Sequence, residues 1–233
     1  MSDAPDDTAP GIAIIGMAGR FPGADTTESF WENLCAGVES ITHFADDELD
    51  DWFSAEERRS ADYVKARPIL TDVDQFDAEF FGMYANEAAL TDPQHRVFLE
   101  CSWQALEDGG YDPAVYPGAI GVFAGSSMNT YFLNNVCADR ATIERFTTSF
   151  QVGGYPMLVG AGREFLSTRV AYKLGLTGPA ITVQTACSTA LTAVWSARTR
   201  RAVLSAATGL PLAAASKVRQ WPSAETIPPS RCM

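Results

Sequence analysis

The sequence is poor in histidine and in positive charge. Only two histidines, His43 and His95, occur among its 233 residues, and 17 lysines and arginines stand against 29 acidic residues. The net charge of −12 repels nucleic acid and anionic lipid, so we expect no partner of either kind. The shortage of histidine also leaves few side chains that can act as a general base near neutral pH.

Paired cysteines and long apolar runs are missing as well. The five cysteines are scattered, odd in number and never spaced as C-x-x-C, which argues against a zinc site and a disulfide framework. No stretch approaches the roughly eighteen apolar residues of a membrane span. The acidic residues 1–10 lack the order of a signal peptide and are interpreted as a disordered leader. These absences predict a reduced, cytoplasmic protein.

The residues that are present favour an α/β domain, because short apolar strands alternate with longer helical patterns. With 46% hydrophobic residues the chain can bury a large core. We predict strands at Ile12–Ile15, Ala119–Gly125 and Ile181–Thr185. The stretch Thr42–Met83 is acidic and aromatic-rich with weak periodicity, which predicts an insertion of short elements rather than a continuation of the sheet.

Capping residues predict where the helices begin and end. The first helix has Asp25 and Glu28 at capping-box spacing and Gly37 as its stop. A long helix begins at Asp92 and ends at Gly109. A third helix precedes Gly175. The apolar faces predicted for the three helices are Phe30, Trp31, Leu34 and Cys35; Phe98, Cys101 and Ala105, flanked by Val97 and Leu106; and Leu166, Val170 and Leu174.

The segment TVQTACSTALTAV places Cys187 between a predicted strand and a helical pattern. A helix start supplies unpaired N–H groups and the positive end of a dipole, which stabilise a thiolate and an oxyanion. The small neighbours Ala186 and Ser188 would let a substrate approach closely. Cysteine is also among the most buried residue types. The residues alone therefore leave Cys187 either a nucleophile or a small core residue.

The apolar residues after Cys187 recur at helical spacing. They are Ala190, Leu191, Val194 and Trp195. We expect them to anchor the helix against the sheet.

Two other motifs are rejected as binding sites. The glycines of GMAGRFPG, at 16, 19 and 23, do not have the G-x-G-x-x-G spacing of a dinucleotide-binding loop, and Pro22 lies where the helix should have begun. The acidic run Asp46–Asp51 lacks the glycine turn of a calcium loop and is interpreted as a solvated face. We therefore predict no metal site and no tightly bound cofactor.

Five segments in order resemble the β-ketoacyl synthases, and most closely the ketosynthase domains of modular type I polyketide synthases. They are IAIIGMAGRFPGADTTESFWENLCAG, ILTDVDQFDAEFFGM, LTDPQHRVFLECSWQALEDGGYDP, GVFAGSS and FLSTRVAYKLGLTGPAITVQTACSTALTAV. The resemblance covers residues 11–194. It implies a thiolase-like α/β/α/β/α sandwich, of which this chain would be the N-terminal half, truncated.

The resemblance also implies a chemistry for Cys187. The aligned cysteine accepts an acyl group from the phosphopantetheine arm of an acyl carrier protein. Malonyl carrier protein is then decarboxylated, and its carbanion attacks the acyl thioester. Ala186 and Ser188 would form the elbow around the nucleophile, and the Cys187 N–H would be one of two oxyanion donors. The family dimerises through the strand before the nucleophile, here Ile181–Thr185, so a homodimer is implied.

The family stabilises the enolate with two histidines of its C-terminal half, and neither His43 nor His95 lies in a segment that matches the ones carrying those histidines. We therefore expect a polyketide-type or fatty-acid-like β-ketoacyl synthase that is incomplete and inactive as this chain alone. Two alternatives stay open. One is a non-catalytic fragment for dimerisation or carrier-protein interaction, and the other is an enzyme completed by a partner chain.

The family pattern ends near Val194. From Trp195 onward the chain has six lysines and arginines against one glutamate, and the three nearest arginines, at 198, 200 and 201, are given no functional role. Neither the strand nor the glycine pair of the family is found there. We predict that residues 195–233 form a divergent, partly disordered tail produced by a shifted reading frame or a misplaced boundary.

Overall fold

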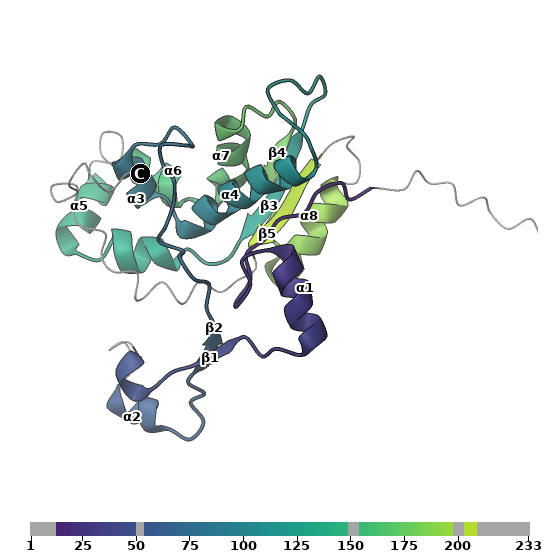
Figure 1. Ribbon diagram of the computed structural model, residues 1–233. Coiled ribbons are helices and arrows are strands. Elements are labelled where there is room, and N and C mark those ends of the chain that lie inside the picture. Colours follow the sequence, from purple (N-terminus) through teal and green to yellow (C-terminus); the bar gives the residue numbers. More distant parts are fainter. Residues whose placement is uncertain (1–12, 50–53, 149–153, 198–202, 209–233) are drawn as a thin grey trace, which may run out of the picture.

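The computed structural model describes residues 13–49, 54–148, 154–197 and 203–208 (Figure 1). Its helices are α1 (Thr27–Ala36), α2 (Ala55–Arg59), α3 (Ala85–Leu90), α4 (Pro93–Asp108), α5 (Arg140–Thr148), α6 (Tyr155–Ala161), α7 (Leu166–Lys173) and α8 (Thr189–Ala197). Its strands are β1 (Ile41–His43), β2 (Ala66–Pro68), β3 (Gly121–Ser126), β4 (Ala180–Thr182) and β5 (Val203–Thr208). The predicted leader and most of the predicted tail lie outside the described residues, so those two interpretations stay predictions.

The central sheet has the order β4-β3-β5, and both outer strands run parallel to β3. Val122 of β3 lies opposite Ala180 on one side and opposite Leu204 on the other. Every residue of β3 is buried, as expected for a parallel strand covered on both faces. The strand β5 was not predicted, and the expectation that no strand follows the last helix is wrong.

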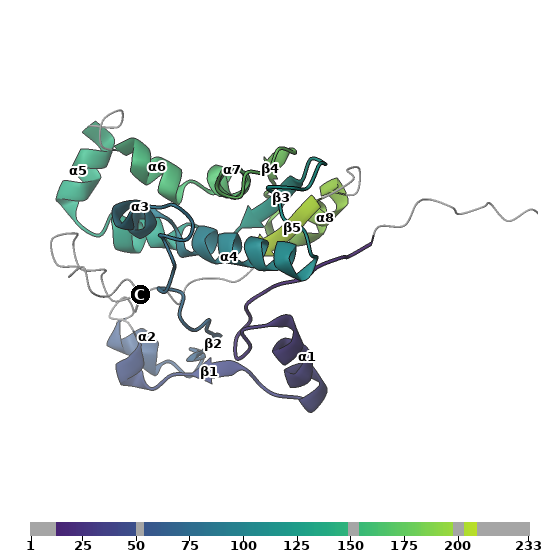
Figure 2. The same cartoon turned by 45° about the horizontal axis from the view of Figure 1, so that its top comes forward.

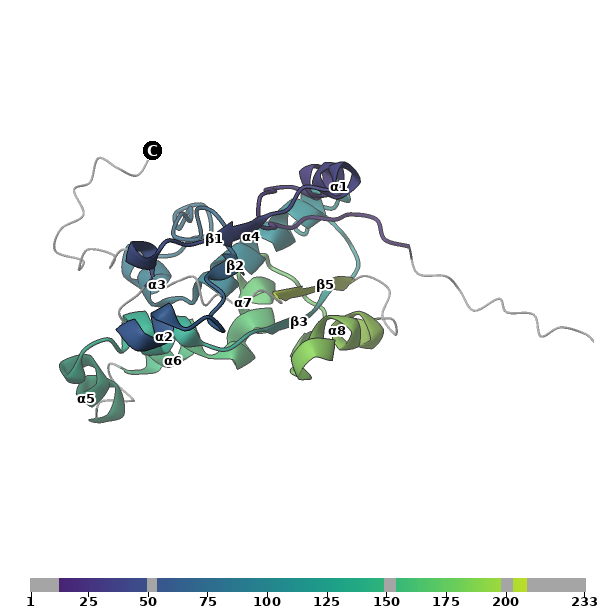
Figure 3. The ribbon, with the colours of Figure 1, turned by 90° about the horizontal axis from the view of Figure 1, so that it is seen from below.

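Successive residues of β3 face two different helical layers, as the period of two of a strand requires. Val122 and Ala124 belong to a core that also contains Leu99 of α4 and Leu166 of α7. Phe123 points to the opposite face and packs with residues of α8. Figure 3 accordingly shows α8 on one side of β3 and β5, and α4 with α7 on the other. The result is a three-layer α/β/α arrangement.

The ends of α4 are confirmed, and its predicted buried face is correct at Phe98 and at the flanking Val97 and Leu106 but wrong at Cys101 and Ala105. The Asp92 carboxylate accepts the N–H of Gln94 at 2.8 Å, and Pro93 occupies the first turn. Cys101 and Ala105 are only half-buried. The buried positions of the helix are Pro93, Gln94, His95, Arg96, Val97, Phe98, Leu99, Ser102 and Leu106. The helix is rotated toward α7 and the sheet, and it buries polar residues that a count of apolar positions overlooks.

The helix α1 ends at Gly37 as predicted, with a φ of 67°, but its start and its face differ. The capping box is formed by Thr26 and Ser29 instead of Asp25 and Glu28, because the Thr26 hydroxyl reaches the Ser29 N–H. None of the residues of α1 is buried, and Trp31 is 66% exposed. Of the predicted apolar face, Phe30 is half-buried and stacks on Phe21, while Trp31, Leu34 and Cys35 are exposed.

The predicted strand Ile12–Ile15 is wrong for its described residues 13–15, which are extended but pair with no strand in the described part of the chain. Both edges of β3 are already occupied by β4 and β5. The segment instead lies against the end of α4, where the Met17 N–H donates to the Asp108 carboxylate at 2.8 Å. At Gly16 a side chain would overlap the carbonyl oxygen of Ala105.

The stretch Thr42–Met83 is confirmed as an excursion of short elements. Its strands β1 and β2 pair antiparallel as a separate two-stranded sheet, and α2 lies between them in sequence. Figures 1 and 2 show these elements standing apart from the central sheet. The third predicted helix is confirmed as α7, with Leu166, Val170 and Leu174 buried and Gly175 at a φ of 65°.

Candidate functional site

Cys187 lies where the chain turns sharply from β4 into α8. The last ladder bond of this strand runs from the Val183 N–H to the Ala124 carbonyl at 2.7 Å, so the predicted strand Ile181–Thr185 is shorter than expected. A 3-10 turn, η5 (Ala186–Ser188), then leads directly into α8. The Cys187 side chain is exposed and carries a free thiol.

The turn contains an unusual backbone conformation at Ala186, whose φ is +51°. Such a left-handed value is uncommon for a residue other than glycine and costs on the order of 1–2 kcal/mol. Strained residues persist where the surrounding structure holds them, and they cluster at functional sites. Here the strain reverses the chain within one residue, immediately before the exposed thiol.

The helix α8 is anchored by a different face from the one predicted. Leu191, Val194 and Trp195 are 76%, 55% and 64% exposed, and Ala190 is exposed as well. The residues that pack on the sheet are Thr189, Ala193 and Ala197, spaced four apart, and the last two contact Phe123. Small residues at this spacing let the helix axis approach the sheet closely, which brings the start of the helix to the end of β4.

One glutamine ties the elbow to the end of β3, and another ties α4 to the residue that follows β3. The Gln184 side-chain amide donates to the Ser126 carbonyl at 2.9 Å. On the other side of the sheet, the Gln94 side chain accepts the Ser127 N–H at 2.7 Å. Sequence analysis missed both residues, although a glutamine within the buried stretch of α4 is a signal that a backbone group needs a partner. The carboxyl ends of β3 and β4 thus meet at Cys187, at the sheet edge where open α/β sheets bind ligands.

Comparison with known proteins identifies this architecture. The model of the β-ketoacyl synthase N-terminal domain matches residues 9–218. The chain belongs to the β-ketoacyl synthase family. The match continues past Val194, the position at which the resemblance was expected to stop.

The sequence relatives are polyketide synthases. A phenolphthiocerol/phthiocerol polyketide synthase of Mycobacterium tuberculosis is 43% identical over 185 residues, which cover 78% of this chain and 12% of that protein. Polyketide synthase GfsA of Streptomyces halstedii is 39% identical over 78% of this chain and 2% of its own length. The chain therefore spans a small part of the relatives it matches.

Solved ketosynthases share the fold. Ketosynthase twelve of the bacillaene polyketide synthase from Bacillus amyloliquefaciens superposes with a TM-score of 0.67 and 34% identity, covering 80% of this chain and 31% of that one. The oxazolomycin ketosynthase domain OzmH KS7 of Streptomyces albus gives a TM-score of 0.64 at 31% identity, over 80% of this chain and 32% of its own. The thiolase-like fold expected from the sequence is confirmed, and the match is to the N-terminal part of a ketosynthase domain.

Neither histidine of this ketosynthase segment serves the elbow. His95 is 1% exposed inside α4, and its Nδ1 has no hydrogen-bond partner within the part of the chain that the structure describes. Burial, with a smaller contribution from the charge of Arg169, lowers the pKa of His95 from 6.5 to about 3, so the ring stays neutral. His43 lies in β1, which stands apart from α8 in Figures 1 and 2.

The other described cysteines are less suited to nucleophilic chemistry or lie elsewhere. Burial raises the pKa of the Cys101 thiol, and it also raises the pKa of Cys137, next to the carboxylate of Asp139. Cys35 is exposed but lies within α1 rather than at a strand-to-helix turn. Of the described cysteines, only Cys187 combines an exposed thiol with a strand-to-helix turn.

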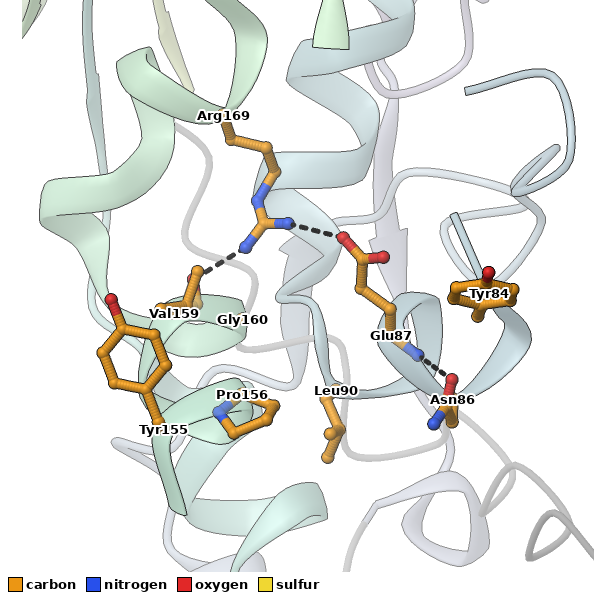
Figure 4. Close-up of a pocket in the computed structure, with 9 residues that line it drawn as sticks. All are labelled: Tyr84, Asn86, Glu87, Leu90, Tyr155, Pro156, Val159, Gly160 and Arg169. Carbon is orange, nitrogen blue, oxygen red and sulfur yellow. Dashed lines mark hydrogen bonds and ion pairs between the residues drawn. The ribbon is translucent and has the colours of Figure 1, made fainter. Parts of the chain in front are cut away.

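A surface pocket of about 330 Å³ lies between α3 and α6 (Figure 4). Arg169 reaches into it from α7, where its guanidinium donates to the Val159 carbonyl at 2.7 Å and lies 3.5 Å from the Glu87 carboxylate. Its other lining residues are Tyr84, Asn86, Leu90, Tyr155, Pro156 and Gly160. The lining holds no cysteine or histidine, and its one cation is matched by an anion. The pocket lies between helices, and none of its lining residues belongs to the elbow.

Two kinds of site were not found in the described ranges. No three or more histidine, cysteine, aspartate and glutamate side chains gather there in a way that could hold a metal ion. No helix among the described residues is both long enough and apolar enough to span a bilayer.

Proposed function

We propose that Cys187 is the acyl-accepting nucleophile of a polyketide-type ketosynthase. The observation that carries this proposal is the exposed thiol at a strained turn between a parallel strand and the start of α8. The Cys187 sulfur would attack the carbonyl carbon of an acyl thioester, forming a new carbon–sulfur bond. The bond to the phosphopantetheine sulfur would break, and that sulfur would leave as a thiol with the proton lost by Cys187.

The start of the helix supplies the electrostatics for this step. The first N–H groups of a helix lack intrahelical acceptors, and the dipole places partial positive charge there. The N–H of Cys187 is the proposed donor to the oxyanion, because it follows the turn at Ala186. The small side chains of Ala186 and Ser188 form the proposed elbow and leave room for the acyl chain.

The second half of the reaction needs groups that the elbow does not bring together. Decarboxylation of a malonyl thioester builds an enolate, which requires hydrogen-bond donors. His95 is buried and neutral, and His43 lies in the β1–β2 excursion. We therefore propose that this chain alone forms the acyl-cysteine without condensing it. Condensation would need donors from a further part of the protein or from a partner chain.

The proposed partners are an acyl carrier protein, which presents substrates on phosphopantetheine, and a second copy of the chain. The described sheet ends at β4, so the outer edge of this strand is open for pairing. Ile181 at this edge is 45% exposed. A dimer formed through residues 181–185 would cover it. A non-catalytic interaction fragment would use the same edge without needing Cys187, and this difference separates the two functions.

The test is acylation of the 233-residue chain by an acyl N-acetylcysteamine thioester, followed by intact mass and peptide mapping. We expect one acyl group on Cys187 and complete loss of this adduct in Cys187→Ala. Cys35→Ala, which removes another exposed thiol, is the matched control and should be acylated normally. No adduct on the wild-type chain would favour the interaction fragment. A condensation product made by this chain alone would contradict the half-reaction.

A further inference from the structure

Thr185, two residues before Cys187, is bonded to the start of α8 through all three of its polar groups. Its N–H donates to the Thr189 hydroxyl at 2.9 Å. Its carbonyl accepts the Ser188 hydroxyl at 2.9 Å, and its own hydroxyl donates to that of Thr192 at 3.1 Å. Thr185, which precedes the elbow, is thus held in place by Ser188, Thr189 and Thr192, which follow Cys187.

The bond to Thr189 replaces a partner that the sheet no longer provides. The last ladder bond of β4 belongs to Val183, two residues earlier. The Thr185 N–H therefore has no strand acceptor in the described sheet, and a partly buried N–H without an acceptor is costly. The Thr189 hydroxyl takes over this role at the point where the chain leaves the sheet.

The methyl branch of Thr189 meets the central strand. Thr189 is 8% exposed, and a Cβ added at Gly125 of β3 would overlap its methyl carbon and also the Val183 carbonyl oxygen. A β-branched side chain in a helix is confined to few rotamers. The rotamer that packs the methyl group on Gly125 therefore also directs the hydroxyl to Thr185.

We propose that Thr189 is a positioning residue for Cys187. It ties the backbone on one side of the elbow to the helix on the other, and so holds Ala186 at positive φ without a glycine. Without the hydrogen bond between the Thr185 N–H and the Thr189 hydroxyl, Ala186 would relax to a negative φ. The thiol and the N–H of Cys187 would then be oriented differently. This inference rests on the proposed function of Cys187 as the acyl acceptor.

Two single substitutions distinguish the role of the Thr189 hydroxyl from that of its methyl group. Thr189→Val removes the hydroxyl and keeps a methyl group over Gly125, whereas Thr189→Ser keeps the hydroxyl. We expect Thr189→Val to lower the rate of Cys187 acylation about tenfold, as expected for the loss of one bond to a partly buried amide. Hydrogen exchange at the Thr185 amide should become faster in the same variant. Thr189→Ser should stay within about threefold of the wild-type rate, since its bond remains.

The matched control is Thr168→Val in α7, an exposed threonine whose hydroxyl donates to the Phe165 carbonyl at 3.2 Å. It should change neither acylation nor exchange at Thr185. The proposal is overturned if Thr189→Val keeps wild-type Thr185 exchange, or if it slows acylation no more than Thr168→Val does. If Thr189→Val does not fold by circular dichroism, Thr189→Ser decides, because an unprotected Thr185 amide in that variant also overturns the proposal.

A failure of the proposed function gives a different pattern. If wild-type Cys187 accepts no acyl group, the acyl-acceptor proposal fails. The Thr185 exchange and the rate of Cys187 alkylation by iodoacetamide, resolved by peptide mapping, still report on the elbow. Thr189→Val should then speed the exchange and change the alkylation rate, while Thr168→Val should leave both unchanged.

Discussion

The starts of α8 and α4 serve opposite purposes. Two residues separate α4 from the end of α3, and Asp92 accepts the N–H groups of Gln94 and His95, whereas α8 continues the 3-10 turn η5. At α8 the residue presented is Cys187, which is exposed. At α4 the residues Asp92–Arg96 are all buried, and they include two potential charges and a histidine.

The two helix starts also differ in what holds them. The start of α4 is held by ionisable groups inside the fold, and burial raises the pKa of Asp92 while it lowers the pKa values of His95 and Arg96. The elbow is held by uncharged hydroxyls that bond the backbone around Thr185. Of the two helix starts, the one at α4 therefore holds the ionisable groups whose pKa values burial shifts, whereas the elbow fixes its backbone without placing a charge beside the thiol.

The largest predicted change in the free energy of unfolding comes from His95, at the start of α4, when the pH falls. Its folded pKa of about 3 lies below the unfolded value near 6.5, so between these values the unfolded chain binds the extra proton. The histidine therefore lowers the free energy of unfolding as pH falls below 6.5, by about 2 kcal/mol at pH 5. Urea unfolding at pH 7 and pH 5 should show this loss in the wild type and not in His95→Gln.

His43→Gln removes the exposed histidine of β1 and is the control for this prediction; the loss at pH 5 should persist in it, because His95 is still present. Subtracting the His95→Gln curve also removes the contribution of Asp92, whose raised pKa acts in the opposite direction at lower pH. Equal pH slopes in the wild type and His95→Gln would show that the start of α4 carries no buried neutral histidine.

A smaller effect is expected from the strained residue of the elbow. Ala186→Val should lower the free energy of unfolding by about 1–2 kcal/mol, because a β-branched residue fits a φ of +51° worse than alanine. Ala186→Gly should be neutral or stabilise the chain by up to about 1 kcal/mol. Urea unfolding measures both.

The matched control for Ala186→Gly is Ala190→Gly on the exposed side of α8, which should cost about 1 kcal/mol. The prediction thus concerns the sign of the change in the free energy of unfolding. Glycine should leave it unchanged or raise it at position 186 and should lower it at position 190. If both glycine variants lost the same stability, Ala186 would not be strained, and the difference between the two helix starts would be smaller than proposed.

The smallest effect is expected at the cap of α4. Asp92→Ala removes the acceptor of the Gln94 N–H and should cost about 1 kcal/mol, whereas Asp92→Asn keeps an acceptor and should cost much less. Thermal or urea unfolding at pH 7 distinguishes the two. Acylation of Cys187 should be unchanged in Asp92→Asn. If the asparagine variant were as unstable as the alanine variant, the carboxylate charge would matter more than the cap.

Local patterns predicted the parts of the fold that depend on local interactions. Asp92 and Gly37 were predicted as helix ends because caps bond within a few residues. The excursion over Thr42–Met83 followed from its weak periodicity. The helices α3, α5 and α6 and the strand β5 were missed. No side chain caps α3 or α6, whereas the Asp139 carboxylate before α5 accepts the Thr142 N–H and was overlooked. The strand predicted at Ile12–Ile15 failed because pairing depends on which edge of β3 is open.

The sequence predicted the nucleophile Cys187 but not the residues that hold it in position. Cys187 was selected by its place between a strand and a helix, together with the resemblance of the surrounding segments. The residues that hold it, Gln184, Thr185 and Thr189, bear no mark in the sequence, because their roles depend on backbone groups left unpaired where the sheet ends. The buried state of His95 was also invisible, since it depends on the rotation of α4 toward α7.

The sequence by itself determined the family, the start of α4 at Asp92, the end of α1 at Gly37 and the cysteine at the end of a strand. These features are set by residue types at fixed short spacings. Only the tertiary structure decided which face of α8 is anchored, which residue carries the backbone strain, and whether the thiol faces solvent. Those outcomes depend on contacts between β3 and α8, which lie more than sixty residues apart in sequence and meet only when the sheet has formed.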